Sequence, residues 1–247
     1  MLKKDLLVFL TAGDPDTKAT LDFMLSVEKY AIIELGIPFS DPIADGKTIQ
    51  RSYYRALKNG FRVKDVFLIA KEFRQHSEKP LVLMTYYNPV FRLGLEKFVE
   101  RAKESGFNAI LLVDLPIDEA GAYLEICRKF EIGTVFLAAP NTKEERLKAI
   151  DDASTFVYLV SLYGTTGARE ELSSLALDLL FRAKKICKKP LAVGFGISKA
   201  EHVEKLIKNG ANGVVVGSAV IEIIEKFGKD AGKYLEEKVK ELSRALN

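Results

Sequence analysis

The sequence predicts an α/β protein in which residues 1–247 form a single domain, a closed (β/α)₈ barrel of the TIM type. Three observations lead to this prediction. Short apolar runs rich in β-branched residues recur along the whole chain, stretches with helical periodicity and Lys/Glu faces separate them, and no linker-like segment interrupts the alternation. Eight strand–helix units in 247 residues fit a closed barrel better than an open doubly wound sheet, although strand counting alone leaves the open sheet possible.

Each predicted strand is almost continuously apolar, which is typical of parallel strands that are covered on both faces. The expected strands are Leu6–Thr11, Ile32–Gly36, Leu81–Thr85, Ala109–Val113, Thr134–Ala138, Phe156–Ser161, Leu191–Gly194 and Gly213–Val216.

The segments between the strands carry apolar residues at helical spacing, and several begin at a Thr, Ser or Asp that can cap a helix. The expected helices are Thr17–Tyr30, Thr48–Lys58, Val63–His76, Glu96–Ser105, Glu119–Phe130, Lys143–Asp151, Glu171–Lys185, Lys199–Asn209 and Ala231–Leu246. A further helix is expected to open at Gly217-Ser218-Ala219.

Composition limits the function classes. Hydrophobic residues make up 48% of the chain, enough for a large core. The net charge of +3 is spread along helical stretches, so a nucleic-acid partner is not expected, and no apolar run is long enough for a signal core or a membrane span. We therefore expect a cytoplasmic protein. The high content of Lys and Glu, with few Gln and no Trp, hints at a thermophilic source.

Cysteine and histidine usage argues against a metal site. Cys127 and Cys187 lie far apart without a CxxC spacing, and only His76 and His202 could join them as ligands. The sequence therefore predicts neither a disulfide framework nor a bound metal.

The segment ELGIPFSDPIADG, residues 34–46, indicates acid–base chemistry. Glu34 lies in an apolar run at the end of a predicted strand, where burial should disfavour its charged form and raise its pKa. Asp41 and Asp45 follow on a loop, where we expect them to be more solvated and ionised. Carboxyl groups with different proton affinities can supply both an acid and a base near neutral pH.

Glycine-rich turns follow the last three predicted strands. Gly196 lies in the turn after the seventh strand, and Gly217 with Ser218 opens the helix after the eighth. Backbone N–H groups at such turns and helix starts favour a bound anion, and these two loops are the usual phosphate site of a (β/α)₈ barrel. The turn after the sixth strand, residues 163–169, has the composition of a lid in which Thr166 and Gly167 could contact ligand.

The chain resembles the tryptophan synthase alpha subunit family nearly from end to end. The motifs that carry the resemblance are FLTAGDP at Phe9–Pro15, ELGIPFSDPIADGKTIQ at Glu34–Gln50, YYNPVF at Tyr86–Phe91, DLP at Asp114–Pro116, YGTTGAR at Tyr163–Arg169, GFGIS at Gly194–Ser198 and VVGSA at Val215–Ala219. The resemblance implies retro-aldol cleavage of indole-3-glycerol phosphate to indole and glyceraldehyde 3-phosphate.

The resemblance also implies a role for individual positions. Glu34 and Asp45 match the catalytic carboxylates, and Thr166 matches the lid residue that meets the catalytic Asp on closure. The remaining positions fall into two groups: Gly167, Gly196, Gly217 and Ser218 match the phosphate-holding backbone, and Phe9, Ile49, Tyr86 and Tyr158 match the indole pocket.

The same family resemblance implies a beta subunit as partner in an alpha2beta2 assembly. Pyridoxal phosphate is expected in that partner only, with no cofactor in this chain. The Asn88-Pro89 segment and Asp41 are then expected to be loop positions that meet the partner.

Two other functions stay open on the residues alone. One is a different sugar-phosphate isomerase or lyase of the phosphate-binding barrel group, because the glycine turns would look similar. The other is a non-catalytic regulatory subunit that binds a phosphate ester, although the presence of both Glu34 and Asp45 argues against it.

Overall fold

A computed structural model describes residues 2–160, 174–194 and 196–246 of the chain. Its strands form a closed parallel barrel in the order β1-β2-β3-β4-β5-β6-β7-β8, with β8 pairing back to β1. The strands are β1 (Asp5–Thr11), β2 (Ile32–Gly36), β3 (Leu81–Thr85), β4 (Ala109–Leu112), β5 (Gly133–Ala138), β6 (Phe156–Val160), β7 (Leu191–Gly194) and β8 (Gly213–Val216). The predicted (β/α)₈ barrel is therefore confirmed.

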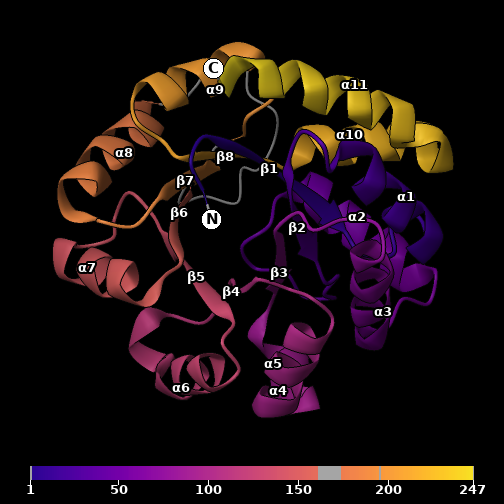
Figure 1. Cartoon of the computed structure of the whole chain (residues 1–247), viewed down its shortest axis with the longest axis horizontal. Coiled ribbons are helices and arrows are strands. Elements are labelled where there is room, and N and C mark those ends of the chain that lie inside the picture. The colour runs from indigo at the N-terminus through magenta and orange to yellow at the C-terminus, as the bar shows by residue number, and fades with distance from the viewer. Residues whose placement is uncertain (1, 161–173, 195, 247) are drawn as a thin grey trace.

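Helices form an outer ring around these strands (Figure 1). The α-helices are α1 (Thr17–Val27), α2 (Lys47–Lys58), α3 (Val63–Arg74), α4 (Tyr87–Leu93), α5 (Leu95–Glu104), α6 (Gly121–Lys129), α7 (Glu144–Ala153), α8 (Ser174–Ile186), α9 (Ala200–Lys208), α10 (Ser218–Phe227) and α11 (Gly232–Ser243). Three short 3₁₀ turns, η1 (Ile117–Glu119), η2 (Gly228–Ala231) and η3 (Arg244–Leu246), complete the described elements.

The segment that contains Asn88 and Pro89 differs from the expectation. We expected a loop, but both residues lie in helix α4, whose N-cap is Tyr86. Pro89 is the third helical residue, where a backbone N–H has no partner within the helix, so the ring costs no hydrogen bond there. The helix therefore tolerates the proline that suggested a loop.

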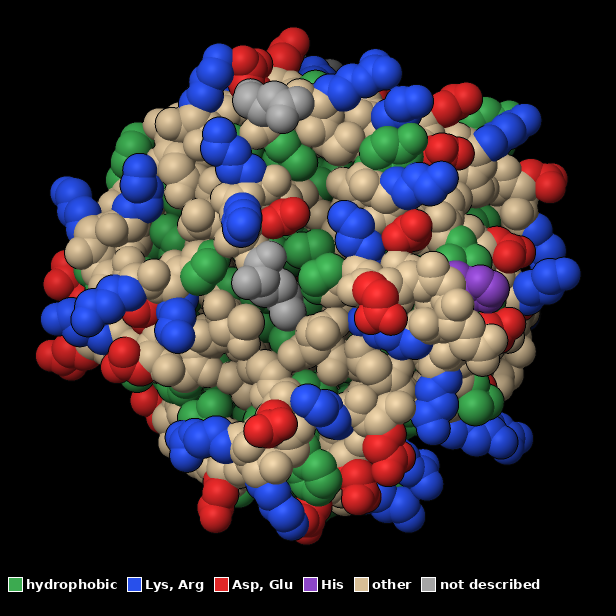
Figure 2. Space-filling view, viewed as in Figure 1, with side chains coloured by type: hydrophobic (Ala, Val, Ile, Leu, Met, Phe, Trp, Pro, Cys, Tyr) green, Lys and Arg blue, Asp and Glu red, His purple; other side chains and the backbone are tan. Residues whose placement is uncertain are grey.

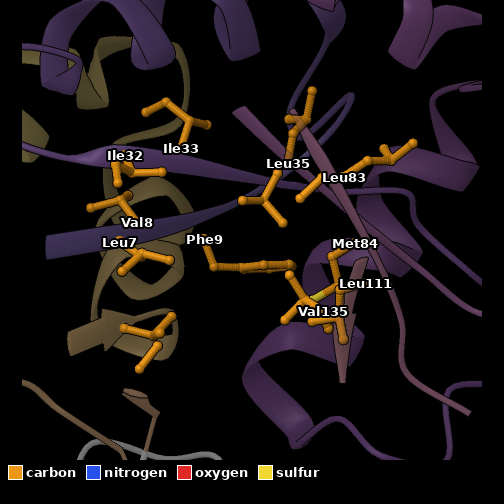
Figure 3. Close-up of a cluster of buried hydrophobic side chains, with 14 of the residues drawn as sticks. Leu7, Val8, Phe9, Ile32, Ile33, Leu35, Leu83, Met84, Leu111 and Val135 are labelled. Atoms are coloured by element: carbon orange, nitrogen blue, oxygen red, sulfur yellow. The ribbon is translucent and has the colours of Figure 1, made fainter. Parts of the chain in front are cut away.

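Strand register decides which side chains face the barrel interior. Phe9 of β1 lies beside Glu34 of β2, and Glu34 lies beside Val82 of β3. Since successive side chains of a strand point to opposite faces, these three positions share the interior face. Figure 3 shows Phe9 extending toward Met84 from the opposite side of the same apolar cluster.

An ion-pair network joins the first strand's loop to two helices beside the barrel mouth. Arg55 of α2 makes a two-pronged contact with Asp14, with Nε–Oδ1 and Nη2–Oδ2 distances of 2.9 and 2.7 Å. Arg55 also reaches Glu225 of α10 at 3.1 Å, and Arg51 pairs with the same glutamate at 2.7 Å. The network therefore ties α2, which follows the acidic loop, to α10, which opens at the predicted phosphate turn.

On the face seen in Figure 2, charged side chains of the two signs are not separated. Lys and Arg are interspersed with Asp and Glu over the face seen in Figure 2. None of the helices in the described ranges is long and apolar enough to cross a membrane.

Candidate active site

Glu34 projects from the middle of β2 into the barrel interior and is only 1% exposed. Neither of its carboxyl oxygens has a hydrogen-bond partner within residues 2–160, 174–194 and 196–246. Burial, and to a lesser degree the nearby charge of Asp45, raises the pKa of Glu34 to about 8. A side chain in this state carries a proton at neutral pH and can donate it.

Asp45 lies on the loop between β2 and α2, one residue before the Gly46 N-cap of α2. We expected a solvated residue from the loop position of Asp45, and this expectation is wrong, because Asp45 is only 8% exposed. Its Oδ2 accepts a hydrogen bond from the Tyr86 hydroxyl at 2.6 Å, and its carboxylate accepts another from Tyr53. Burial raises the pKa of Asp45, and these two hydroxyl donors oppose that rise.

Glu34 and Asp45 line one cavity. It lies at the carboxyl ends of the strands, where barrel enzymes carry their chemistry. Its lining joins two acids to apolar side chains and to glycine turns: Phe9, Glu34, Asp45, Ile49, Met84, Tyr158, Gly194, Gly196, Ile197, Val215, Gly217 and Ser218. The structure therefore brings most of the sequence-predicted site residues together in one cavity.

The predicted phosphate turns reach this cavity from β7 and β8. Gly217 is the N-cap of α10 and Ser218 is its first residue, so the positive end of a ten-residue helix faces the pocket. Gly196 has a φ of +70°, a conformation that favours glycine, and it lets the chain turn close to the same space. This end of the cavity is suited to an anion.

Among the predicted site residues that the structure describes, Tyr86 is not part of the cavity lining. Tyr86 is 1% exposed and its hydroxyl turns toward Asp45. Thr166 and Gly167 fall within residues 161–173, outside the described part of the chain. Asp41 is exposed on the loop after β2, in agreement with a solvated position.

Four lining residues were not assigned to the site from the sequence: Met84, and Gly194, Ile197 and Val215, which belong to the GFGIS and VVGSA motifs. Strand alternation could have found Met84, which lies two residues after the inward-facing Val82. Gly194 could not have been found this way. It matters because a Cβ at this position would lie 3.0 Å from the ring and the hydroxyl of Tyr158.

Tyr53 was also missed, although its spacing of four residues from Ile49 on the expected helix could have marked it as inward-facing. Tyr53 is 2% exposed whereas Tyr54 is 66% exposed, since helical periodicity turns only the former toward the barrel.

Within the described ranges, no group of three or more His, Cys, Asp or Glu side chains could hold a metal ion.

The closed parallel barrel and a pocket at the carboxyl ends of its strands define the class, a (β/α)₈ barrel of the kind that carries enzyme active sites. Comparison with known families narrows this class. The family described as "Tryptophan synthase alpha chain" matches residues 2–247. The chain belongs to the tryptophan synthase alpha chain family, as the sequence motifs had indicated.

Individual relatives agree with this assignment. The tryptophan synthase alpha chain of Pyrococcus furiosus is 62% identical over 96% of both chains, and that of Thermococcus kodakarensis is 58% identical over 98% of this chain and 96% of its own length. A solved chain from the tryptophan synthase a2b2 complex of the hyperthermophile Pyrococcus furiosus superposes with a TM-score of 0.95 at 62% identity, covering 98% of this chain and 99% of that one.

Proposed function

We propose that this chain cleaves indole-3-glycerol phosphate by a retro-aldol reaction, with Glu34 and Asp45 as its catalytic residues. The observation that carries the proposal is the carboxyl group of Glu34, which is buried without a partner among the described residues and faces the same cavity as Asp45 and the start of α10. A buried acid without a partner costs stability, so its retention in a pocket indicates a chemical role.

The cavity supplies a separate place for each part of this substrate. The phosphate monoester binds at the N-terminus of α10, on the backbone of Gly217 and Ser218, with Gly196 alongside. The indole ring packs among Phe9, Ile49 and Tyr158, whose apolar surfaces line the same cavity. Gly167 and Thr166, outside the described residues, are proposed to complete the phosphate site and the lid.

The raised pKa of Glu34 gives the order of the proton transfers. Its protonated carboxyl first donates to the ring carbon that carries the side chain, which turns the indole into an indolenine with positive charge at its nitrogen. The bond between that carbon and the side chain then breaks, and its electron pair returns to the ring and restores neutral indole. The side-chain hydroxyl gives its proton back to Glu34 and becomes the aldehyde, so the carboxyl ends as it began.

Asp45 stabilises the charge that develops during this reaction. Its ionised carboxylate accepts a hydrogen bond from the indole N–H, and this interaction strengthens as positive charge appears at the ring nitrogen. Asp45 is only 8% exposed, so such a contact is stronger than in solution. Glu34 thus transfers protons, whereas Asp45 contributes electrostatic stabilisation.

We further propose that the chain works with a tryptophan synthase beta subunit in an alpha2beta2 assembly. The support is the similarity to a chain of the Pyrococcus furiosus a2b2 complex, which is described as showing mutual activation. Pyridoxal phosphate would then belong to the beta subunit only, and this chain would need no cofactor of its own.

The test is indole release from indole-3-glycerol phosphate, measured for the chain alone and after addition of a beta subunit. Glu34→Gln and Asp45→Asn should each lower kcat by about 10²–10⁴, because each removes one positioned acid–base or charge contact. Glu237→Gln on the exposed face of α11 serves as the matched control and should keep wild-type activity. Near-normal turnover in either pocket variant, with unchanged folding, would contradict the assignment.

A further inference from the structure

Tyr53 lies on the inner face of α2 and contacts Asp45, which lies on the loop between β2 and α2. Its side chain is buried, and its hydroxyl donates a hydrogen bond to the Asp45 carboxylate. It does not belong to the cavity lining, so it makes no contact with the space in which the substrate would bind. A buried hydroxyl directed at one carboxylate, outside the pocket, indicates that it acts through that carboxylate.

Tyr86 approaches the same carboxylate from the end of β3. Its hydroxyl donates to Oδ2 of Asp45 at 2.6 Å and accepts from the backbone N–H of Ala44 at 3.0 Å. Its ring stacks on Phe39 with the centroids 5.0 Å apart. The N–H of Ala44 and the ring of Phe39 hold the Tyr86 side chain in place. The Tyr86 hydroxyl therefore donates its proton toward Asp45.

We propose that Tyr53 is a positioning residue of this site, which together with Tyr86 holds the carboxylate of Asp45 in one orientation at the pocket wall and keeps it ionised. The role of Asp45 in the chemistry rests on the proposed function. The two hydrogen bonds that fix it are features of the fold itself.

The need for two donors follows from the surroundings of Asp45. Within the described part of the chain, the titratable groups that face it are Glu34 on β2, Tyr53 on α2, Tyr86 after β3 and Tyr158 on β6. No cation stands among these described groups, and the hydrogen bonds to the carboxylate come from the neutral hydroxyls of Tyr53 and Tyr86. Burial raises the pKa of Tyr53 well above its usual value, which keeps its proton available for donation.

The direction of the pH effect follows from the bonding. A hydrogen bond to the ionised form of a carboxyl lowers its pKa, so removing the Tyr53 hydroxyl raises the pKa of Asp45. Asp45 then takes up a proton at a higher pH, and the acidic limb of activity moves upward. A tyrosine that only filled space would leave this limb unchanged.

The experiment compares Tyr53→Phe with Tyr54→Phe. The first removes a buried hydroxyl and keeps the ring, and the second makes the same chemical change at the neighbouring exposed position. In Tyr53→Phe, the acidic limb of kcat/KM should move up by about one pH unit, and kcat should fall about tenfold with KM changed by less than about twofold. Tyr54→Phe should match the wild type in all three quantities.

A second comparison tests whether Tyr53 acts through Asp45. In the Asp45→Asn background, adding Tyr53→Phe should change the residual kcat by less than about twofold, because the group on which the hydroxyl acts has already lost its charge. An additional tenfold fall in that background, or a Tyr53→Phe profile that overlies the wild type, would overturn the inference.

A direct titration separates this inference from the proposed function. The ¹³C signal of the Asp45 carboxyl, assigned by its loss in Asp45→Asn, should titrate at higher pH in Tyr53→Phe than in the wild type. If the wild type releases no indole with or without a beta subunit, the proposed function fails, and a shifted titration would still support the positioning role. An unshifted Asp45 titration would overturn the positioning role whatever the activity.

Discussion

The burial of Glu34 has two consequences that can be measured separately. One concerns catalysis, since a carboxyl with a pKa of about 8 is protonated at neutral pH and loses its proton in mildly alkaline solution. The other concerns stability, since the folded chain keeps a proton that the unfolded chain would release.

The first consequence is a prediction for the alkaline limb of activity. If Glu34 must donate a proton first, kcat/KM for indole release should fall as the pH rises through about 8. Asp45, which must be ionised, should set the acidic limb. A rate that keeps rising well above pH 9, measured with a stable substrate and a folded chain, would contradict the assignment of the first proton transfer to Glu34.

The second consequence is a prediction for the pH dependence of stability. The pKa of Glu34 is raised from 4.5 to about 8 on folding, so wild-type stability should decline as the pH rises from about 4.5 to about 8 and then level off. Glu34→Gln removes this decline. The variant's gain in unfolding free energy should therefore grow over this range, reaching on the order of a few kcal/mol. Denaturant unfolding at a series of pH values provides the measurement, and a pH-independent difference would argue against a buried, protonated Glu34.

At this scale, the sequence indicated the acids but not all of their surroundings. Apolar neighbours along β2 were enough to predict that Glu34 is buried with a raised pKa. The burial of Asp45 could not be predicted, because it depends in part on Tyr86, which lies after β3 and 41 residues further along the chain. A local pattern reports the strand that a residue occupies, whereas a loop residue is buried by what folds over it.

Among the elements, α10 has the most direct link between position and function. Its N-terminus contributes Gly217 and Ser218 to the cavity, and its far end carries Glu225, which pairs with α2. The helix is thus both the proposed phosphate site and a support for the helix that follows Asp45.

The phosphate role of α10 predicts a change in KM. Gly217→Ala fits the fold, because φ is −116° and the added Cβ would lie 3.6 Å from Phe9 and 3.9 Å from Ile49, but the methyl group enters the cavity. We expect KM to rise about tenfold with kcat nearly unchanged, since phosphate contacts are equal in ground and transition states. Gly232→Ala, at the start of α11, should leave both constants unchanged. A fall in kcat alone would mean that α10 does not hold the phosphate.

Removing the ion pair between α2 and the loop after β1 should lower the free energy of unfolding. The Asp14 side chain is fully buried, and Arg55→Ala would leave it without its cation. We expect unfolding free energy to fall by about 2–4 kcal/mol, whereas Lys208→Ala, which breaks an exposed pair with Glu204, should cost less than about 1 kcal/mol. Similar losses in the two variants, measured by denaturant unfolding, would show that Arg55 does not stabilise a buried charge.

Helix α4 is an element that the sequence pattern did not predict. Strand positions were predicted almost to the residue, because each strand is a continuous apolar run between polar segments. Helix α4 has only seven residues and contains Pro89, so its sequence lacks the periodicity that identifies a helix and carries a residue typical of a turn.

For the whole molecule, the barrel explains why separate motifs act together. The acids come from β2 and its loop, the phosphate turns from β7 and β8, and the apolar walls from β1, α2 and β6. Because β8 pairs with β1, the first and last strands of the chain lie side by side and the barrel is closed. The fold class and the family were predictable from the spacing of strands and from the motifs, and both are confirmed.

The compositional hint of a thermophilic source agrees with the relatives, which include alpha chains from the hyperthermophile Pyrococcus furiosus. Interspersed charges of both signs, seen over one face in Figure 2, are the pattern expected of surface ion-pair networks that gain importance at high temperature.

The most direct test of the central proposal is a crystal structure of the Glu34→Gln chain with indole-3-glycerol phosphate bound. The phosphate should lie at the N-terminus of α10 within hydrogen-bond reach of the backbone at Gly217 and Ser218. The indole N–H should face Asp45, and the side chain at position 34 should reach the ring carbon and the neighbouring hydroxyl. A phosphate bound elsewhere, or an indole ring beyond the reach of either position, would contradict the account.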